Sequence, residues 1–217
     1  MSLPKPYYDH AGITIYNCDC REVLPFLGHF DLLLTDPPYG IGAAAGKSFG
    51  GGQRGHRKSH DPTRQWDEKR GCVHALTTAR FHAKHQVIWG GQYFADVLPP
   101  SGKWLVWDKL QRLDQSDGEL AWTSSGGALR IFGLNRIAVQ VDGAVHPTQK
   151  PLALITWCIN QFPGVQSVFA PFMGSGTTLV AAKPLGLRAV GIDLEREYCD
   201  MAVERLAQDC IPGMVGE

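Results

Sequence analysis

Short apolar runs that alternate with helical patterns constrain the fold of this 217-residue chain more than any other feature. The runs typical of strands are GITIYN, FDLLLT, QVIWG, KWLVW, LRIFG, RIAVQ, SVFA and LRAVGI. Helical spacing is found in segments 21–27, 67–82, 150–161, 177–185 and 195–208. Apolar strands separated by helices are typical of a mainly parallel sheet covered on both faces, so the sequence predicts an α/β fold. Ligands of such sheets bind beyond the carboxyl ends of the strands.

Length and composition predict one intracellular domain. A chain of 217 residues suits a single domain over 1–217. No apolar run is long enough to span a bilayer, and the opening MSLPKPYYDHAG lacks the regions of a signal peptide. Six cysteines without a C-x-x-C pair fit neither a disulfide framework nor a zinc ribbon. We therefore expect reduced cysteines, no bound metal and no membrane partner.

The formal net charge is zero, but the charges are unevenly distributed. Between Lys47 and Arg70, seven Lys or Arg residues stand against three acids. On charge alone, a solvated surface loop explains this stretch at least as well as a nucleic-acid arm does. The low-complexity segment GIGAAAGKSFGGGQRG predicts a mobile loop at about 42–66.

The stretch SVFAPFMGSGTTLV places a glycine turn directly after a predicted strand. Glycines let a backbone approach a ligand closely, and the following helix offers free N–H groups. Gly174-Ser175-Gly176 alone is equally compatible with a tight connection that binds nothing. The next strand ends in Asp193, about 20 residues on, where nucleotide-binding units place the acid that accepts ribose hydroxyls. The pair therefore favours a ribose-bearing cofactor.

A second loop, Asp36-Pro37-Pro38-Tyr39, follows the strand FDLLLT. The two prolines stiffen the loop and remove two N–H donors, so hydrogen-bond acceptors dominate it. A carboxylate and a proline carbonyl suit an exocyclic amino group, and the tyrosine ring suits stacking on a flat base. An ordinary rigid turn is the simpler alternative, but this composition at a strand end favours an amino-group site.

The third loop is Asn17-Cys18-Asp19, between a strand and a predicted helix. Asp19 can cap the helix, or it can accept a hydrogen bond from the amino group of a bound purine. The sequence does not separate these two roles.

Together these segments resemble the amino-methyltransferases that modify adenine N6 or cytosine N4 in DNA with S-adenosylmethionine as donor. DPPY resembles their catalytic motif, FAPFMGSGTT the methionine-binding motif, HPTQKP the segment preceding it, and GIDLEREYCDMAVERL the ribose-binding strand and helix. The catalytic motif comes first in this chain, which resembles the permuted, beta-type arrangement. Glutamine and ribosomal-RNA guanine methyltransferases carry the glycine turn first, so the order disfavours them.

The resemblance implies a class I methyltransferase (Rossmann-like) fold that is circularly permuted. Its sheet would have seven strands, mostly parallel, with one reversed. Segments 166–170 and 187–192 would be the first two strands. They would be followed in space by 12–17, 30–35, 86–90 and 103–107.

The resemblance also assigns roles to residues. The catalytic loop would comprise Asp36, Pro37, Pro38 and Tyr39, with Asp36 and Pro37 on the target amino group and Tyr39 stacked on the flipped base. The donor site would comprise Asp19, Lys150, Ala170, Phe172, Met173, Gly174, Ser175, Gly176, Thr177 and Asp193. Within it, Lys150 would lie by the methionine end and Asp193 would take the ribose hydroxyls. The expected DNA contacts are Lys47, Arg54, Arg57 and Lys58.

Two departures from the family pattern qualify this interpretation. The family usually has Asp at the position of Ala170, where the carboxylate would pair with the donor's ammonium. Its loss is expected to weaken donor affinity by roughly 10- to 150-fold, unless a neighbour such as Asp36 or Glu22 compensates. The second departure is size, since only a small target-recognition insert, at about 108–145, fits in the chain. Trp107 and Trp122 in it are expected to pack in the core.

The sequence thus predicts a site-directed DNA methyltransferase that acts on adenine N6 in the cytoplasm, in association with the nucleoid. A homodimer would supply additional grip on DNA. The DPPY form of the motif resembles mainly the adenine enzymes. Two alternatives remain open: a weakened or inactive nucleic-acid-binding homologue, and a methyltransferase of cytosine N4 or RNA.

Overall fold

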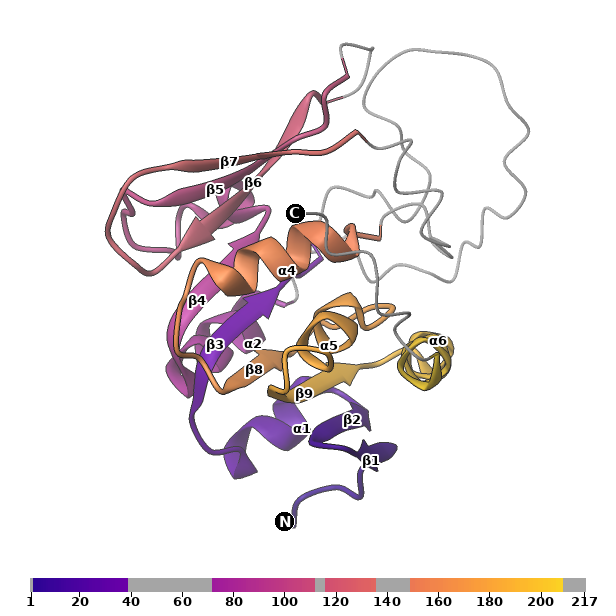
Figure 1. The fold of residues 1–217 in the computed structure, drawn as a ribbon. Coiled ribbons are helices and arrows are strands. Elements are labelled where there is room, and N and C mark those ends of the chain that lie inside the picture. The colour runs from indigo at the N-terminus through magenta and orange to yellow at the C-terminus, as the bar shows by residue number, and fades with distance from the viewer. Residues whose placement is uncertain (1, 39–71, 112–115, 136–148, 209–217) are drawn as a thin grey trace, which may run out of the picture.

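The computed structural model describes residues 2–38, 72–111, 116–135 and 149–208. Their strands form one sheet in the order β1-β2-β9-β8-β3-β4-β6-β5-β7 (Figure 1). The strands are β1 (Tyr8–His10), β2 (Ile13–Asn17), β3 (Phe30–Thr35), β4 (Ala83–Trp89), β5 (Trp104–Asp108), β6 (Gly118–Thr123), β7 (Arg130–Gly133), β8 (Ser167–Ala170) and β9 (Arg188–Asp193). The helices are α1 (Cys20–Val23), α2 (Val73–Ala79), α4 (Leu152–Asn160), α5 (Thr177–Ala182) and α6 (Arg196–Ala207). Short 3₁₀ turns occupy Leu24–Phe26, Arg80–His82 and Gly91–Phe94.

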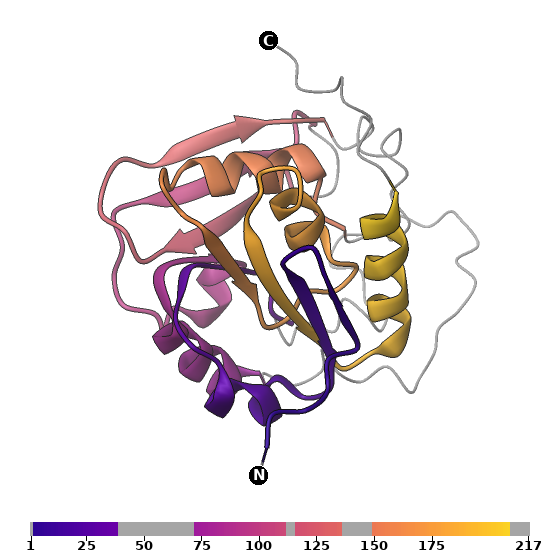
Figure 2. The ribbon, with the colours of Figure 1, turned by 60° about the horizontal axis from the view of Figure 1, so that its bottom comes forward.

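Helices cover both faces of the sheet, which explains why the central strands are apolar throughout. Leu32 and Leu34 of β3 pack into the cluster beneath α4, α5 and α6, whereas Leu33 packs into the cluster beneath α1 and α2. Figure 1 shows α4 and α5 in front of the sheet and α2 behind it, and Figure 2 shows the strands between these groups. Because successive side chains of a strand point to opposite faces, a strand covered on both sides reads as one apolar run.

The predicted fold class is confirmed. The seven strands from β2 to β5 in the sheet order form the core, and β6 is the one reversed strand among them, antiparallel to β4 and β5. The short strands β1 and β7 extend the two edges. The last strands of the chain, β8 and β9, lie in the middle of the sheet, between β2 and β3, as a permuted order requires.

Two details of the expected sheet are wrong. Segment 13–17 does not lie between β9 and β3 but pairs with the outer side of β9, because β8 pairs directly with β3. The strand β6 was not expected at all, since its polar start within SDGELAWT reads as a turn. The expected strand at 136–140 lies outside the described residues.

The structure describes part of the expected target-recognition insert at about 108–145. Residues 118–123 and 130–133 of this segment are strands of the sheet. Trp107 and Trp122 are buried, at 3% and 2% exposure, so the expectation of core packing is confirmed for both. A target-recognition role for the segment stays a prediction, and the loop at 42–66 lies outside the described residues.

Within the described ranges, no helix combines the length and the apolar character needed to cross a bilayer.

Candidate active site

The Asp36 loop starts where β3 ends, at the carboxyl edge of the sheet. β3 is parallel to β4 and β8, so the ends of these strands meet at one edge. Pro37 is buried, and the Pro38 carbonyl accepts a hydrogen bond from Cys72 Sγ at 3.2 Å. The structure therefore places Asp36, Pro37 and Pro38 where the sequence predicted them, and Tyr39 lies outside the described residues.

Lys150 connects the Asp36 loop to β6 through two ion pairs. Its Nζ lies 2.5 Å from Asp36 Oδ2 and 3.0 Å from Glu119 Oε2 on β6. Glu119 Oε1 in turn lies 2.7 Å from Lys109 Nζ. The two ammonium groups lie over the indole rings of Trp89 and Trp107, at 5.4 and 5.2 Å from the ring centroids. Two acids and two lysines thus alternate along the edge; we call them the charged cluster.

Burial and ion pairing have opposite effects on the pKa values of Lys150 and Glu119 in the charged cluster. Lys150 and Lys109 are only 8% and 7% exposed. Burial opposes the charged form of Lys150, but the carboxylates of Asp36 and Glu119 outweigh it and raise the pKa of Lys150 above its ordinary value. Burial likewise opposes ionisation of Glu119, but the two lysines outweigh it and lower the pKa of Glu119 to about 2. Lys150 and Glu119 therefore both carry their charges at neutral pH.

The glycine turn follows β8 and has the backbone geometry that only glycine adopts readily. Gly174 and Gly176 have φ of 52° and 76°. A Cβ on Gly176 would lie 2.5 Å from Ala202 Cβ of α6, whereas a Cβ on Gly174 would meet no atom within 4 Å. The turn thus packs tightly against α6 at Gly176 and leaves space beside Gly174.

Asp193 connects the end of β9 to this turn. Its Oδ2 accepts a hydrogen bond from Gly174 N at 2.9 Å, and its Oδ1 accepts one from Glu195 N at 2.9 Å. The side chain of Asn17, at the end of β2, donates to the carbonyls of Asp193 and Leu194. Burial raises the pKa of Asp193 to about 6. The predicted ribose acceptor and the glycine turn are therefore joined directly.

Asp19 is the N-cap of α1. Its Oδ1 accepts from Arg21 N at 2.9 Å, and Glu22 Oε1 accepts from Asp19 N, which completes a capping box. Hydrogen bonds from the Arg21 side chain lower the pKa of Asp19, and the two side chains also form an ion pair. Capping is thus the observed role of Asp19, and its contact with a purine stays a prediction. Glu22 is engaged in the same cap, so it offers no support for compensation at Ala170.

Ala170 ends β8 with its side chain in the apolar cluster beneath α4 to α6. It is 1% exposed and pairs with Gly191 of β9. Of the next residues, Phe172 packs on the α1 and α2 side and Met173 on the α4 to α6 side. Their opposite directions fix the start of the turn, and Met173 N donates to Ile192 O at 3.0 Å.

Sequence reasoning missed three residues that organise this edge: Lys109, Glu119 and Arg205. Arg205 Nη1 of α6 donates to Ser175 O at 2.7 Å and to Thr177 Oγ1 at 3.0 Å, which ties the glycine turn to the helix. Burial lowers the pKa of Arg205. Arg205 is half-buried and lies three residues after the buried Ala202 on α6, and a basic residue beside the apolar face of a helix was an available signal for a polar partner. No comparable signal marked Glu119, because its strand was not recognised.

Two further polar atoms at this edge lack partners among the described residues. Thr35 Oγ1 at the end of β3 and Trp89 Nε1 at the end of β4 are buried without a hydrogen bond there. Buried polar groups without partners are costly, so they are typical of positions that receive a ligand or another chain segment. Among the described residues, no three His, Cys, Asp or Glu side chains are grouped closely enough to hold a metal ion.

The Asp36 loop and the glycine turn share one edge of a permuted class I sheet. This arrangement is the one expected of a DNA amino-methyltransferase. The family model N6_N4_Mtase, described as DNA methylase, matches residues 82–204. The chain therefore belongs to the N6/N4 DNA methyltransferase family. The match includes Lys150, the glycine turn and Asp193.

Named relatives agree with this assignment. The chain is 26% identical over 276 residues to the Type II methyltransferase M.ScaI of Streptomyces caespitosus, covering 94% of this chain and 84% of the relative. It is 26% identical over 250 residues to the Type II methyltransferase M2.DpnII of Streptococcus pneumoniae, covering 94% and 93%.

Solved structures show the same fold. The crystal structure of the M1.HpyAVI–SAM complex matches with a TM-score of 0.62 at 24% identity, over 90% of this chain and 100% of that one. The PvuII DNA methyltransferase, which is cytosine-N4-specific, matches with a TM-score of 0.65 at 14% identity, over 95% and 90%.

Proposed function

We propose that this chain transfers a methyl group from S-adenosylmethionine to the N6 amino group of adenine in DNA. The observation that carries the proposal is the meeting of Asp36, Lys150 and the Gly174 to Asp193 connection at one edge of the sheet. Membership of the N6/N4 family supports the reaction class. The SAM complex of M1.HpyAVI, a protein of the same fold, supports the choice of donor.

The residues at the glycine turn fit a donor that contains a ribose. The space beside Gly174 lets a ligand approach the backbone, because a side chain there would occupy it. The carboxylate of Asp193 accepts hydrogen bonds and stands directly beside that space. Lys150, an ammonium, suits the carboxylate at the methionine end. The sulfonium of S-adenosylmethionine supplies an electrophilic methyl group.

Asp36 and its prolines would orient the target amino group. The carboxylate and the Pro37 carbonyl accept its two N–H groups, which turns the nitrogen lone pair toward the methyl carbon. A nitrogen–carbon bond forms, the carbon–sulfur bond breaks, and the sulfur keeps the bonding electron pair. Positive charge develops on the nitrogen, and the Asp36 carboxylate stabilises it until the surplus proton leaves.

Adenine is favoured over cytosine by the DPPY form of the loop. The PvuII match does not weigh against this choice, since a likeness at 14% identity concerns the fold alone. The test uses S-adenosylmethionine with a deuterated methyl group, duplex DNA and mass analysis of the digested nucleosides. Label in N6-methyldeoxyadenosine is expected. Label only in N4-methyldeoxycytidine, or only in RNA nucleosides when RNA is supplied, would overturn the adenine assignment.

DNA is the proposed partner. A type II restriction-modification system is the proposed setting, since M.ScaI and M2.DpnII are both named Type II methyltransferases. The alignment with M.ScaI spans 276 residues, more than this chain has, so that relative contains segments that are absent here. We infer that target recognition is correspondingly small, that a homodimer compensates, and that the protein acts at the nucleoid. The proposed DNA contacts at Lys47, Arg54, Arg57 and Lys58 lie outside the described residues.

A further inference from the structure

Glu119 lies at the centre of the charged cluster, although nothing in the sequence marked it. One of its oxygens lies 3.0 Å from Lys150 Nζ and the other 2.7 Å from Lys109 Nζ. Lys150 is therefore shared between two carboxylates, since Asp36 Oδ2 lies 2.5 Å away on its other side. Through Lys150, Glu119 links the Asp36 loop to β6.

The reversed direction of β6 brings Glu119 to this edge. A strand antiparallel to β4 begins where its neighbours end, and Glu119 pairs in register with Trp107 near the end of β5. Ala121, two residues on, lies in the same apolar cluster as Trp89 and Trp107. Glu119 thus points toward the face on which Lys150 lies, and a one-residue shift of register would turn it away.

We propose that Glu119 is a positioning residue for methyl transfer: it holds the Lys150 ammonium beside Asp36 and remains its partner when Asp36 turns to the target amino group. This inference rests on the proposed function, because Asp36 is assigned the target amino group there. The inference assigns a role to a residue of β6, a strand that lies outside the DPPY loop and the glycine turn.

Charge balance explains why a second carboxylate is needed. Lys150 is almost fully buried, and a buried ammonium without a partner is strongly disfavoured. When Asp36 also accepts from the target amino group, its negative charge is shared between that group and Lys150, so its hold on Lys150 weakens. Glu119 removes this conflict, and Lys109 balances the charge on Glu119, so the four groups sum to zero. The pairing also keeps Lys150 protonated at the pH at which the donor would bind.

The titratable groups around Lys150 come from four parts of the fold. Asp36 follows β3, Glu119 stands on β6, Lys109 follows β5 and reaches Lys150 through Glu119, and Cys158 lies on α4. Replacing Glu119 by Gln removes one of two negative charges while burial and Lys109 remain. The pKa of Lys150 should then fall, and deprotonation should enter the working pH range.

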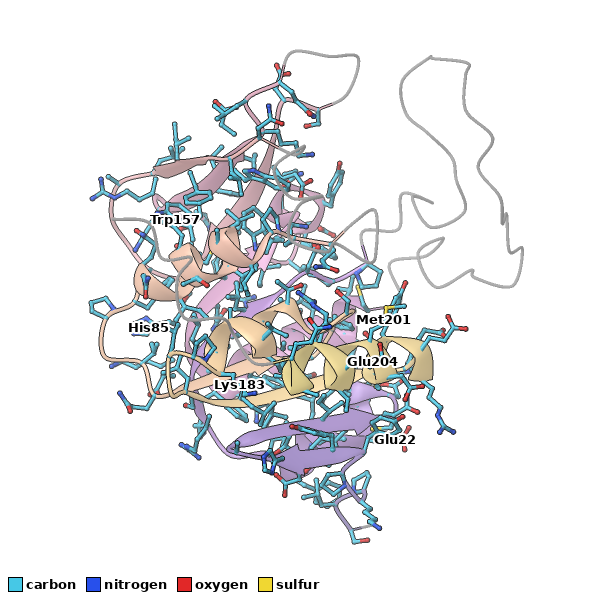
Figure 3. The ribbon with its side chains drawn as sticks, turned by 45° about the vertical axis from the view of Figure 1, so that its right-hand side comes forward. Glu22, His85, Trp157, Lys183, Met201 and Glu204 are labelled. Atoms are coloured by element: carbon cyan, nitrogen blue, oxygen red, sulfur yellow. The ribbon has the colours of Figure 1, made fainter. Side chains whose placement is uncertain are left out.

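The test compares Glu119→Gln, Glu119→Asp and the control Glu204→Gln in methyl-transfer kinetics from pH 6 to 10. Glu204 is an exposed acid on α6, labelled in Figure 3, so its substitution removes the same charge outside the cluster. Glu119→Gln should lower kcat at least about tenfold and lose further activity between about pH 8 and 10. Glu119→Asp keeps the charge and should keep the alkaline side of the wild-type profile, as should Glu204→Gln. A folded Glu119→Gln protein with wild-type kcat and pH profile would overturn the proposal.

If Glu119→Gln does not fold, Lys109→Gln takes its place. This variant leaves both carboxylates on Lys150, so the alkaline side of its pH profile should stay at the wild-type pH, whatever the change in kcat. A new loss of activity at high pH in Lys109→Gln would contradict the assigned role of Glu119.

A second readout separates this inference from the proposed function. Acetic anhydride labels unprotonated amines, and peptide mass spectrometry gives the labelling of Lys150 relative to exposed Lys84. At pH 8, Glu119→Gln should raise that ratio several-fold over the wild type, whether or not DNA is methylated. Absence of methyl transfer by the wild type, with the raised ratio present, would refute the proposed function alone. An unchanged ratio would refute the proposal that Glu119 keeps Lys150 protonated.

Discussion

The two halves of the site are built by different physical means. The proposed donor half, from Phe172 to Thr177 with Asp193, is fixed by backbone geometry: two left-handed glycines, N–H groups on a carboxylate and a half-buried arginine on a carbonyl. The proposed target half, at Asp36, is fixed by charge, through Lys150 and Glu119. Backbone geometry tolerates little change of side chain, whereas an ion network tolerates changes of shape but is sensitive to changes of charge and pH.

The largest expected effect separates the two halves. Asp36→Asn should lower methyl transfer at least about a hundredfold, because the neutral amide no longer stabilises charge on the nitrogen. Donor affinity should change by less than about threefold, because Gly174 and Asp193 make no contact that involves Asp36 and Glu119 still holds Lys150. Single-turnover transfer and calorimetric titration of the same samples measure both quantities.

Asp31→Asn is the matched control for that experiment. Asp31 lies on the same strand at the opposite edge of the sheet, where it accepts from Gln166 N and Ser167 Oγ. Its substitution should cost stability and leave turnover intact. Unchanged turnover in Asp36→Asn would remove Asp36 from the mechanism.

The rigidity of the donor half can be tested with its two glycines. Gly174→Ala should cost about 1 kcal/mol, from left-handed backbone alone, because space is available for the methyl group. Gly176→Ala adds a clash with Ala202 and should cost about 2–4 kcal/mol. Chemical denaturation measures both free energies of unfolding. Equal losses in the two variants would mean that the contact with α6 does not constrain the turn.

The smallest expected effect is a pair of opposite pH dependences at Asp193, whose pKa is raised by burial to about 6. Between about pH 4 and 6 the folded protein holds a proton there that the unfolded chain has released. The contribution of Asp193 to the free energy of unfolding therefore falls as the pH rises through that window. Donor affinity should instead rise several-fold between about pH 5 and 7, because the ionised carboxylate is the better acceptor for ribose hydroxyls.

Asp193→Asn should flatten both dependences, as measured by denaturation and calorimetry across that pH range. Donor affinity that is constant across the range in the wild type would contradict the assigned ribose contact.

The donor half was predictable from the sequence, and much of the target half was not. The residues that form the turn are adjacent in the chain, and glycine reports directly on backbone conformation, so FMGSGTT indicated its own structure. The charged cluster joins residues 36, 109, 119 and 150, which only the sheet order brings together. That order depends on β6, whose start within SDGELAWT has the composition of a turn. Asp19 is a third case, because the sequence suited both a helix cap and a contact with a purine. The structure shows Asp19 as the cap of α1.

The most direct test of a working methyltransferase is a calorimetric titration of S-adenosylmethionine into the unaltered protein. Methyl transfer to DNA is assayed on the same sample. Ala170→Asp, and Ala170→Asn as its uncharged control, are titrated alongside. The unaltered protein is predicted to bind the donor and transfer its methyl group, and Ala170→Asp to bind about 10- to 150-fold more tightly. Neither binding nor transfer by the unaltered protein, with both recovered in Ala170→Asp, would contradict this prediction and indicate a nucleic-acid-binding homologue disabled at one residue.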